Sequence, residues 1–386
     1  MRLAYFFSSL FLNIRHACLI VVIFLSLSLV PFQAFSQEKY DKIIELSIES
    51  GPFISNGDPW ADELIDLVSY TAFDFRFGWR QNKTFMGDLY RNPIFGIGVS
   101  STLPYQSEIG RPMGVYWFFD MPFRPFSQDK RFNFSYFAHL GLGFNLNPYD
   151  SLDNPINQFI GSELNSYIHF GAKANYTLSD RFQLFSMVGL KHFSNGSTRK
   201  PNAGINLVPV SIGLRYNFQP SQVKPEEAFL RDRPILFEKG YWNFMLYTGS
   251  KNYEIGEETY FRGGFNLSYI WDKNYKYRYG VGLDVFFAPG LSERSGNPDV
   301  GFWDQTSVAI AGAWEWKLTE RLYAPVGLGF YLHRNRENQE STIYYERIGL
   351  RYLMSENLQF GAQIKAHRIK ADFFEFTLGY RFLRKQ

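Results

Sequence analysis

The chain has 386 residues and a formal charge of only +3, from 40 basic and 37 acidic side chains. That balance argues against nucleic acid as the main partner, because nucleic-acid-binding proteins present a clustered basic surface. Aromatic residues make up 19% of the chain, and no long apolar run follows residue 36. Abundant aromatic residues without apolar helices are typical of transmembrane β-strands with interfacial aromatic girdles. A soluble, aromatic-rich β-sandwich is the alternative.

Residues 1–36 have the features of a secretory signal peptide. Arg2 and Arg15 precede an apolar run, and Ala34–Ser36 forms a small-residue cleavage site. The apolar run is shorter than the roughly 20 residues of a spanning helix, which argues against the alternative of a retained anchor. The only cysteine, Cys18, lies in this segment. The mature chain is therefore expected to have no disulfide, thiolate metal site or cysteine nucleophile.

Residues 37–218 are predicted to form an antiparallel transmembrane β-barrel with its ends on the periplasmic side. Its segments alternate in polarity, and several reach the about 9–11 residues that a tilted spanning strand needs. Residues 59–69 carry acidic side chains and are expected to form a short helix or an extracellular loop. Residues 195–203 are expected to form an extracellular loop. The eight strands should begin near Ile43, Ala72, Pro93, Pro112, Phe132, Ser166, Arg181 and Ile205.

The pattern of strands then repeats after a proline-rich segment, residues 219–239, which is predicted to be a periplasmic linker. In residues 240–386, VGLGFYL (326–332) repeats the LGLGFNL of residues 140–146. Such duplication predicts two tandem eight-stranded barrels, and one wider barrel of about sixteen strands is the alternative. Strands of the second unit should begin near Gly240, Thr259, Tyr275, Thr306, Arg321, Thr342, Asn357 and Asp372.

Polar residues with the chemistry of a catalytic site occur where two of these strands meet. Side chains alternate between the faces of a strand, so His192 and Ser194 share the mainly apolar face of one strand, and Asn206 shares that of the next. Antiparallel pairing brings all three to one rim. A Ser and a His two residues apart on one face can form a base-activated nucleophile. On an apolar outer face, such a site suits a membrane barrel with a lipid substrate.

The pattern His-x-Ser-Asn followed by Pro-Asn-x-Gly-Ile resembles that of the lipid A 3-O-deacylase (PagL) family of outer-membrane barrels. The resemblance covers roughly Ile43 to Phe218. It implies that His192 is the base, that Ser194 is the nucleophile and that Asn195 is an oxyanion-hole donor. The family's third member is a Glu, and its spacing falls on Asn206 here. An Asn can orient an imidazole, as in Cys-His-Asn proteases, but it supplies no charge.

The resemblance implies an esterase that removes the acyl chain at the 3 position of lipid A in the outer membrane. Lys191, Arg199 and Lys200 lie near the site and are candidates to attract lipid A phosphates, unless they simply form a solvated basic loop. No metal or organic cofactor is implied. The sequence leaves open whether the chain forms a homodimer. The alternative functions are a non-catalytic surface-binding or structural barrel with a relic site, and a small pore.

The second repeat is expected to lack this site. Alignment of residues 178–192 with 354–368 places Arg368 at the position of His192 and Lys370 at that of Ser194. His367 has the parity of a lumen-facing residue. Asp372 takes the place of Asn206 and is interpreted as a residue of the barrel rim.

Overall fold

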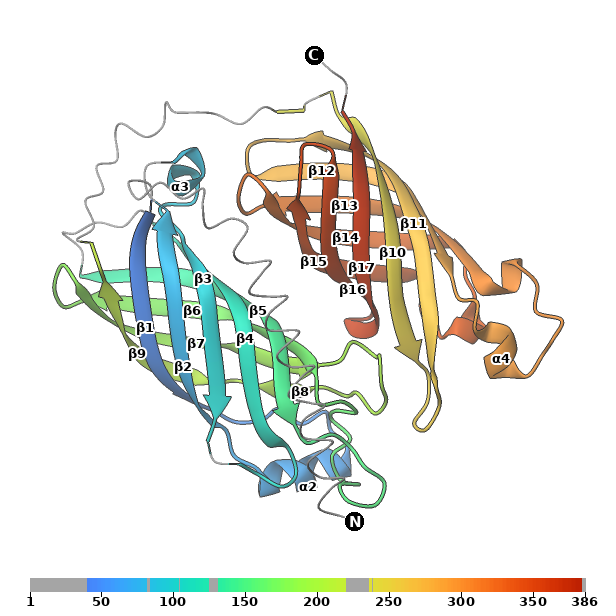
Figure 1. Ribbon diagram of the computed structural model, residues 1–386, viewed down its shortest axis with the longest axis horizontal. Helices are drawn as coiled ribbons and strands as arrows, with labels where there is room; N and C mark the ends of the chain where they lie inside the picture. Colours follow the sequence, from blue (N-terminus) through green and yellow to red (C-terminus); the bar gives the residue numbers. More distant parts are fainter. Residues whose placement is uncertain are drawn as a thin grey trace, which may run out of the picture.

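The computed structural model describes residues 40–81, 84–103, 105–124, 131–219, 236–237 and 239–383. They form two closed, eight-stranded antiparallel β-barrels in tandem (Figure 1). The predicted fold is therefore confirmed, and the single sixteen-stranded barrel is excluded. Each of the sixteen predicted strand starts lies within three residues of an observed one, and only β9 has no predicted start of its own. The predicted signal peptide and most of the predicted linker lie outside the described residues.

The N-terminal barrel is closed by pairing of β1 with β9, in register from Ile43 with Asn217. A short strand, β8, continues the line of β9, and both pair with β7. Val208 and Pro209 separate β8 from β9, because a proline has no N–H to donate to a ladder. The strands are β1 (Tyr40–Ser50), β2 (Thr71–Gln81), β3 (Ile94–Thr102), β4 (Gly110–Pro122), β5 (Phe132–Leu146), β6 (Asn165–Thr177), β7 (Phe182–Ser194), β8 (Ile205–Leu207) and β9 (Val210–Asn217).

The C-terminal barrel is closed by pairing of β10 with β17. Its strands are β10 (Tyr241–Asn252), β11 (Thr259–Asp272), β12 (Tyr277–Phe287), β13 (Thr306–Lys317), β14 (Leu322–His333), β15 (Tyr344–Leu353), β16 (Leu358–His367) and β17 (Lys370–Phe382). The short helices of the chain are α2 (Pro59–Leu67), α3 (Phe85–Leu89) and α4 (Leu291–Ser295), with 3-10 turns η3 (Trp303–Gln305) and η4 (Arg336–Asn338). Of the two alternatives for residues 59–69, a short helix or a loop, the structure forms the helix, α2. No helix in the described part of the chain is long and apolar enough to cross a membrane.

Polarity is inverted relative to a soluble barrel, with charges inside and apolar side chains outside. On β1, Leu46 is 51% exposed on the outer face, whereas the neighbouring Glu45 is fully buried in the lumen. Glu45 lies 2.8 Å from Lys173 Nζ and 3.1 Å from Arg76 Nε. Such an apolar exterior around a polar interior defines a membrane-spanning barrel. The buried ion pairs fill the lumen, as is usual for eight strands.

The two barrels contact each other at the end where β9 finishes and β10 begins, which we call the linker end. There Tyr90, just after α3, donates its hydroxyl hydrogen to the carbonyl of Lys317 and accepts a hydrogen bond from Trp316 Nε1 at 2.8 Å. Met86, Met121 and Leu318 pack around this contact. A second contact lies at the opposite end of the barrels, which we call the site end.

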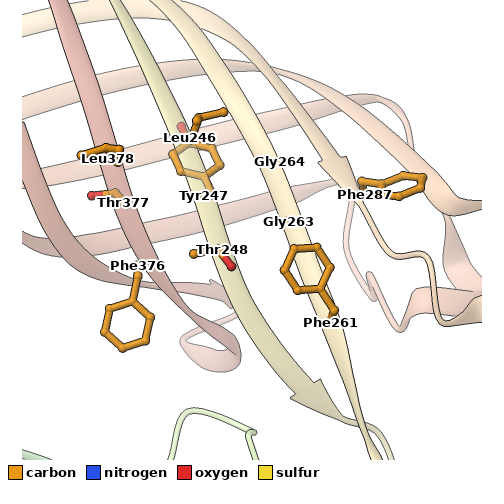
Figure 2. A pocket seen from close by; sticks show the side chains of 10 residues that line it. All are labelled: Leu246, Tyr247, Thr248, Phe261, Gly263, Gly264, Phe287, Phe376, Thr377 and Leu378. Carbon is orange, nitrogen blue, oxygen red and sulfur yellow. The ribbon is translucent and has the colours of Figure 1, made fainter.

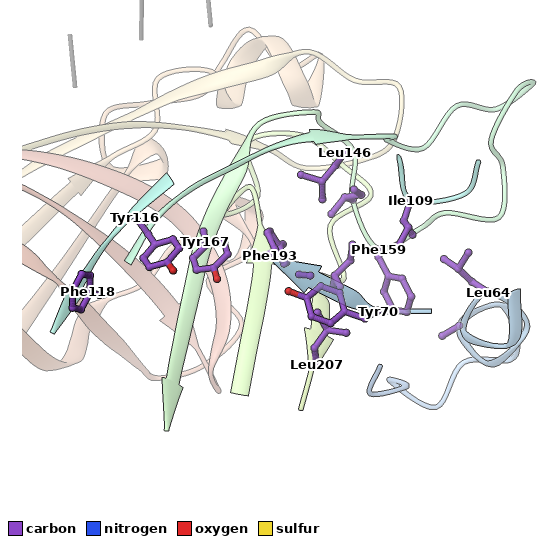
Figure 3. Packing of buried hydrophobic residues seen from close by; sticks show 14 of the residues in the cluster. Leu64, Tyr70, Ile109, Tyr116, Phe118, Leu146, Phe159, Tyr167, Phe193 and Leu207 are labelled. Carbon is purple, nitrogen blue, oxygen red and sulfur yellow. The ribbon is translucent and has the colours of Figure 1, made fainter. Parts of the chain in front are cut away.

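At the site end, the lumen of the N-terminal barrel is closed by an apolar cluster (Figure 3). Leu64 of α2, Phe159 of the loop after β5, and Leu207 of β8 all belong to it. Phe193 joins the cluster from β7 and packs edge-on against Tyr167 at a ring distance of 5.2 Å. Because Phe193 is the residue between His192 and Ser194, its burial fixes the strand end that carries them.

Candidate active site

Strand alternation separates the residues at the end of β7 into two environments. Lys191 and Phe193 point into the barrel and are buried, while His192 and Ser194 lie on the outer face. The register pairs His192 directly with Asn206 of β8. Side chains opposite one another in an antiparallel ladder are within contact distance. The sheet alone therefore brings together the three residues that the sequence singled out.

These three side chains form one hydrogen-bonded chain. His192 Nε2 lies 2.9 Å from Ser194 Oγ, and His192 Nδ1 lies 2.7 Å from Asn206 Oδ1. An amide oxygen can only accept, so the proton of the neutral imidazole sits on Nδ1. Nε2 is then free to accept the Ser194 hydroxyl hydrogen, which is the geometry of a base and its nucleophile. Ser194 is only 4% exposed, so neighbouring segments enclose most of this array.

Gly204 makes room for the imidazole, a role that the sequence analysis missed. Its φ is +82°, and a Cβ at this position would lie 2.6 Å from His192 Cε1. Both its backbone conformation and the close approach of the ring require glycine. The carbonyl of Gly204 also accepts a 3.4 Å hydrogen bond from Asn206 Nδ2, which fixes the amide with its oxygen toward the imidazole. The glycine in the Pro-Asn-Ala-Gly-Ile segment was the available signal.

Asn195 stabilises the loop that follows Ser194. Its side-chain amide donates to Ser162 Oγ at 3.0 Å and to the Arg199 carbonyl at 2.8 Å. Its backbone N–H donates to Asn202 Oδ1 at 3.1 Å. As an oxyanion donor, the role implied by the resemblance, Asn195 would have to give up one of these partners. Within the described part of the chain, the backbone N–H of the next residue, Gly196, has no hydrogen-bond partner.

The three candidate phosphate-binding cations occupy different environments. Lys191 faces the lumen, where it forms an ion pair with Glu49 and a 2.8 Å hydrogen bond with the Tyr70 hydroxyl. Its expected contact with a lipid phosphate on the outer surface is therefore wrong, because the side chain points to the other face of the strand. Arg199 is exposed in the loop, as a cation that meets headgroups must be. Lys200 is partly covered, and its pKa is lowered by burial and by nearby Lys370.

The C-terminal barrel has a different structure at the corresponding place. Arg368 and Ile369, both with positive φ, form the two-residue turn between β16 and β17, so no loop equivalent to residues 195–204 exists there. His367 faces the lumen as expected and contacts the Tyr331 hydroxyl at 3.0 Å. Asp372 is not a rim residue, because it is buried in the lumen 3.0 Å from Lys365 Nζ. Within the described ranges, no group of three or more His, Cys, Asp or Glu could hold a metal ion.

An apolar hollow of about 490 Å³ indents the outer face of the C-terminal barrel (Figure 2). Across four neighbouring strands, the ladder aligns outward-facing Phe376, Thr248, Gly263 and Phe287 in one row. The two central residues are small and the two outer ones are large. The floor of the hollow therefore lies between aromatic walls.

Fold and site together define a membrane-spanning β-barrel with a Ser–His–Asn array on its lipid-facing side. Residues 72–215 match the family model described as lipid A 3-O-deacylase (PagL). Residues 240–385 match the model described as acyloxyacyl hydrolase, C-terminal domain. The two family models thus match the two barrels separately, the first within the N-terminal barrel and the second over the C-terminal one.

Similar solved structures are outer-membrane barrels. Neisserial surface protein A (NspA) is 13% identical with a TM-score of 0.29, covering 46% of this chain and 97% of its own. The Pseudomonas putida toluene transporter TodX is 9% identical with a TM-score of 0.17, covering 90% of this chain and 89% of its own. At such scores neither comparison carries an argument about function. A search of curated proteins finds no match.

Proposed function

We propose that this protein is an outer-membrane esterase that hydrolyses the ester-linked acyl chain at the 3 position of lipid A. The observation that carries the proposal is the hydrogen-bonded chain from Asn206 through His192 to Ser194 on the lipid-facing side of the barrel. The family description supplies the substrate, and both matched families are named for hydrolysis of acyl esters. A lipid ester in the outer leaflet reaches such a site by lateral diffusion.

The reaction proceeds in two halves. Ser194 Oγ attacks the ester carbonyl while His192 Nε2 takes its proton, and the imidazolium then returns that proton to the departing sugar oxygen. The C–O bond to the sugar breaks and leaves an acyl group on Ser194. A water molecule attacks this acyl-enzyme with His192 again acting as base. The fatty acid leaves, and Ser194 regains its proton.

Asn206 holds the imidazole in the required tautomer throughout. Because an amide is neutral, it orients His192 without stabilising the imidazolium by charge. The backbone N–H of Gly196 and the side-chain amide of Asn195 are the donors that we propose for the oxyanion. Loss of one such donor typically costs about 2.7–4 kcal/mol of barrier. Exposed Arg199 is the cation that we propose for the lipid A phosphates.

Purified protein incubated with lipid A tests this function. Mass spectrometry should detect a released 3-hydroxy fatty acid with the wild type and none with Ser194→Ala or His192→Ala. Heat-dependent mobility on gels verifies that each variant is a folded barrel. Equal release by the wild type and Ser194→Ala would refute the assignment. No release by a folded wild-type barrel would favour a non-catalytic barrel with a relic site.

A further inference from the structure

The C-terminal barrel binds the loop that follows Ser194. At the site end, the backbone N–H of Asn252 donates to the Ser197 carbonyl at 2.8 Å, and its side-chain oxygen accepts from the Lys200 backbone N–H at 2.9 Å. The Ser197 hydroxyl donates to the Ala371 carbonyl at 3.0 Å. Thr259 Oγ1 donates to the Thr198 carbonyl at 2.9 Å. Two hairpins of one barrel therefore hold a single loop of the other.

Asn252 is itself rigidly fixed. It is the last residue of β10 and is only 2% exposed. Its amide nitrogen donates to the carbonyls of Glu257 at 2.9 Å and Glu258 at 3.0 Å. The amide nitrogen is thus hydrogen-bonded to its own barrel, and the amide oxygen is hydrogen-bonded to the loop. A group held in this way fixes its partner at low entropic cost.

The bound loop has a backbone that needs support. Gly196 and Ser197 are consecutive residues with positive φ, at +60° and +65°. Glycine adopts this conformation freely, but a serine there is strained and persists only where its surroundings hold it. Ser197 contacts the C-terminal barrel through both its carbonyl and its hydroxyl. Only two residues separate it from Ser194.

We propose that the active site is completed by both barrels, with Asn252 as a positioning residue that holds residues 196–200 in the conformation needed at Ser194. The proposal rests on the proposed function, because it assigns the geometry of the same site. It gives the C-terminal barrel, which lacks its own Ser–His pair, a role in the chemistry. Misplacement of catalytic groups by about 1 Å can cost about 100-fold in rate.

Labelling of Ser194 by a fluorophosphonate probe tests the proposal without reference to lipid A. Asn252→Ala should slow labelling at least 10-fold. Asn252→Asp keeps the oxygen that accepts from Lys200 but loses both donations to the carbonyls of Glu257 and Glu258, so it should recover only part of the rate. Asn274→Ala is the matched control, because Asn274 accepts from two backbone N–H groups of the β11–β12 turn at the linker end. It should label as fast as the wild type.

Ser197→Ala tests the same contact from the loop side, in case Asn252→Ala does not fold. It removes only the hydrogen bond to Ala371 and should slow labelling severalfold. Wild-type labelling rates in folded Asn252→Ala, or in Ser197→Ala, would overturn the proposal. A wild type that is folded but never labelled would instead overturn the proposed function, so the two failures are distinct.

One wall of the apolar hollow in the C-terminal barrel stands two residues along β17 from a contact with the same loop. A Cβ at Gly196 would lie 3.2 Å from Phe374 Cβ, and the Phe374 and Phe376 rings are 5.1 Å apart. Phe376 forms one wall of the hollow (Figure 2). An aromatic path of two residues thus joins the loop to the hollow. Its volume falls in the about 300–1,000 Å³ range of small-molecule sites.

We infer that the hollow takes one acyl chain of the lipid whose ester is held at Ser194. The inference again rests on the proposed function. Because lipid tails are as apolar as the hollow, an acyl chain is held there by the closer packing of a fitted surface. A long-chain substrate should therefore bind through the hollow, whereas a short-chain ester should not reach it.

Thr248→Phe fills the floor of the hollow with a residue that suits a strand. It should raise KM for lipid A at least 10-fold with little change in kcat, and leave hydrolysis of p-nitrophenyl butyrate unchanged. Ile310→Phe is the matched control, since Ile310 is exposed on the outer face of β13, away from the hollow. Equal KM values for the two variants would overturn the inference. A wild type inactive on both esters would overturn the proposed function instead.

Discussion

Asn206 Oδ1 lies 2.7 Å from His192 Nδ1, so an uncharged amide occupies the place of the carboxylate that orients the base in most Ser–His sites. The contact follows from the sheet, since the two residues are direct partners in the β7–β8 ladder. The site is thus built to orient the imidazole, and the charge that would stabilise its protonated form is missing.

Restoring that charge should speed the reaction. Asn206→Asp keeps the side-chain shape and should raise kcat about 10-fold, which corresponds to about 1.4 kcal/mol of barrier. Asn206→Glu should act in the same direction. Asn206→Ala should lower kcat at least about 10-fold, because the tautomer is no longer fixed. Initial rates on lipid A measure all three variants. A slower Asn206→Asp enzyme would mean that a negative charge beside His192 does not assist the reaction at this site.

A methyl group at Gly204 should displace the imidazole. Gly204→Ala places a Cβ against His192 Cε1 at a position of positive φ, so we expect a fall in kcat of at least about 10-fold. Gly57→Ala is the control, because Gly57 also has positive φ, at +88°, but nothing lies within 4 Å of the added Cβ. It carries the same backbone strain, of about 1 kcal/mol, without the clash. Equal rates in the two variants would contradict the role given to Gly204.

The lumen ion pairs should determine the stability of the N-terminal barrel. Glu45→Gln leaves Lys173, Arg76 and Arg215 with one anion fewer inside the barrel and should cost about 3–5 kcal/mol of unfolding free energy. Leu46→Val, one residue along on the lipid-facing side, should stay within about 0.5 kcal/mol of wild type. Urea unfolding in lipid vesicles measures both. Similar losses of unfolding free energy in the two variants would contradict the stabilising role of the lumen ion pairs.

Two basic residues of the site region should behave in opposite ways. Lys191→Met leaves Glu49 buried without its cation and should destabilise the barrel by about 3–5 kcal/mol, with KM for lipid A unchanged. Arg199→Ala should raise KM and leave stability unchanged, because its side chain is exposed. Paired measurements of KM and urea midpoint separate the two effects. A raised KM in folded Lys191→Met would contradict its placement in the lumen.

Strand positions and the faces of strands were predictable from the sequence, because period-two alternation records which side of each strand meets lipid. The same parity placed His192 and Ser194 outside. It also places Lys191 on the opposite face, which conflicts with the expectation that Lys191 attracts lipid A phosphates. The sequence predicts a single strand from Ile205, whereas Pro209 divides it into β8 and β9.

The contact between the barrels at the site end was not predictable. Each of its hydrogen bonds has at least one backbone partner, such as the carbonyls of Ser197, Thr198 and Ala371, and any sequence supplies these. The burial of Asp372 was missed because a two-residue turn replaced the long loop of the first repeat and changed which face follows it. The role of Gly204 could not be predicted without the position of the imidazole, which depends on pairing between β7 and β8.

The proposed function depends above all on removal of an acyl chain from lipid A by Ser194. The most direct measurement is mass spectrometry of lipid A from cells that express the wild type, beside cells that express Ser194→Ala at equal levels in the outer membrane. We expect the loss of one ester-linked hydroxyacyl chain with the wild type and intact lipid A with the variant. Identical lipid A from both strains, with both proteins folded, would contradict it.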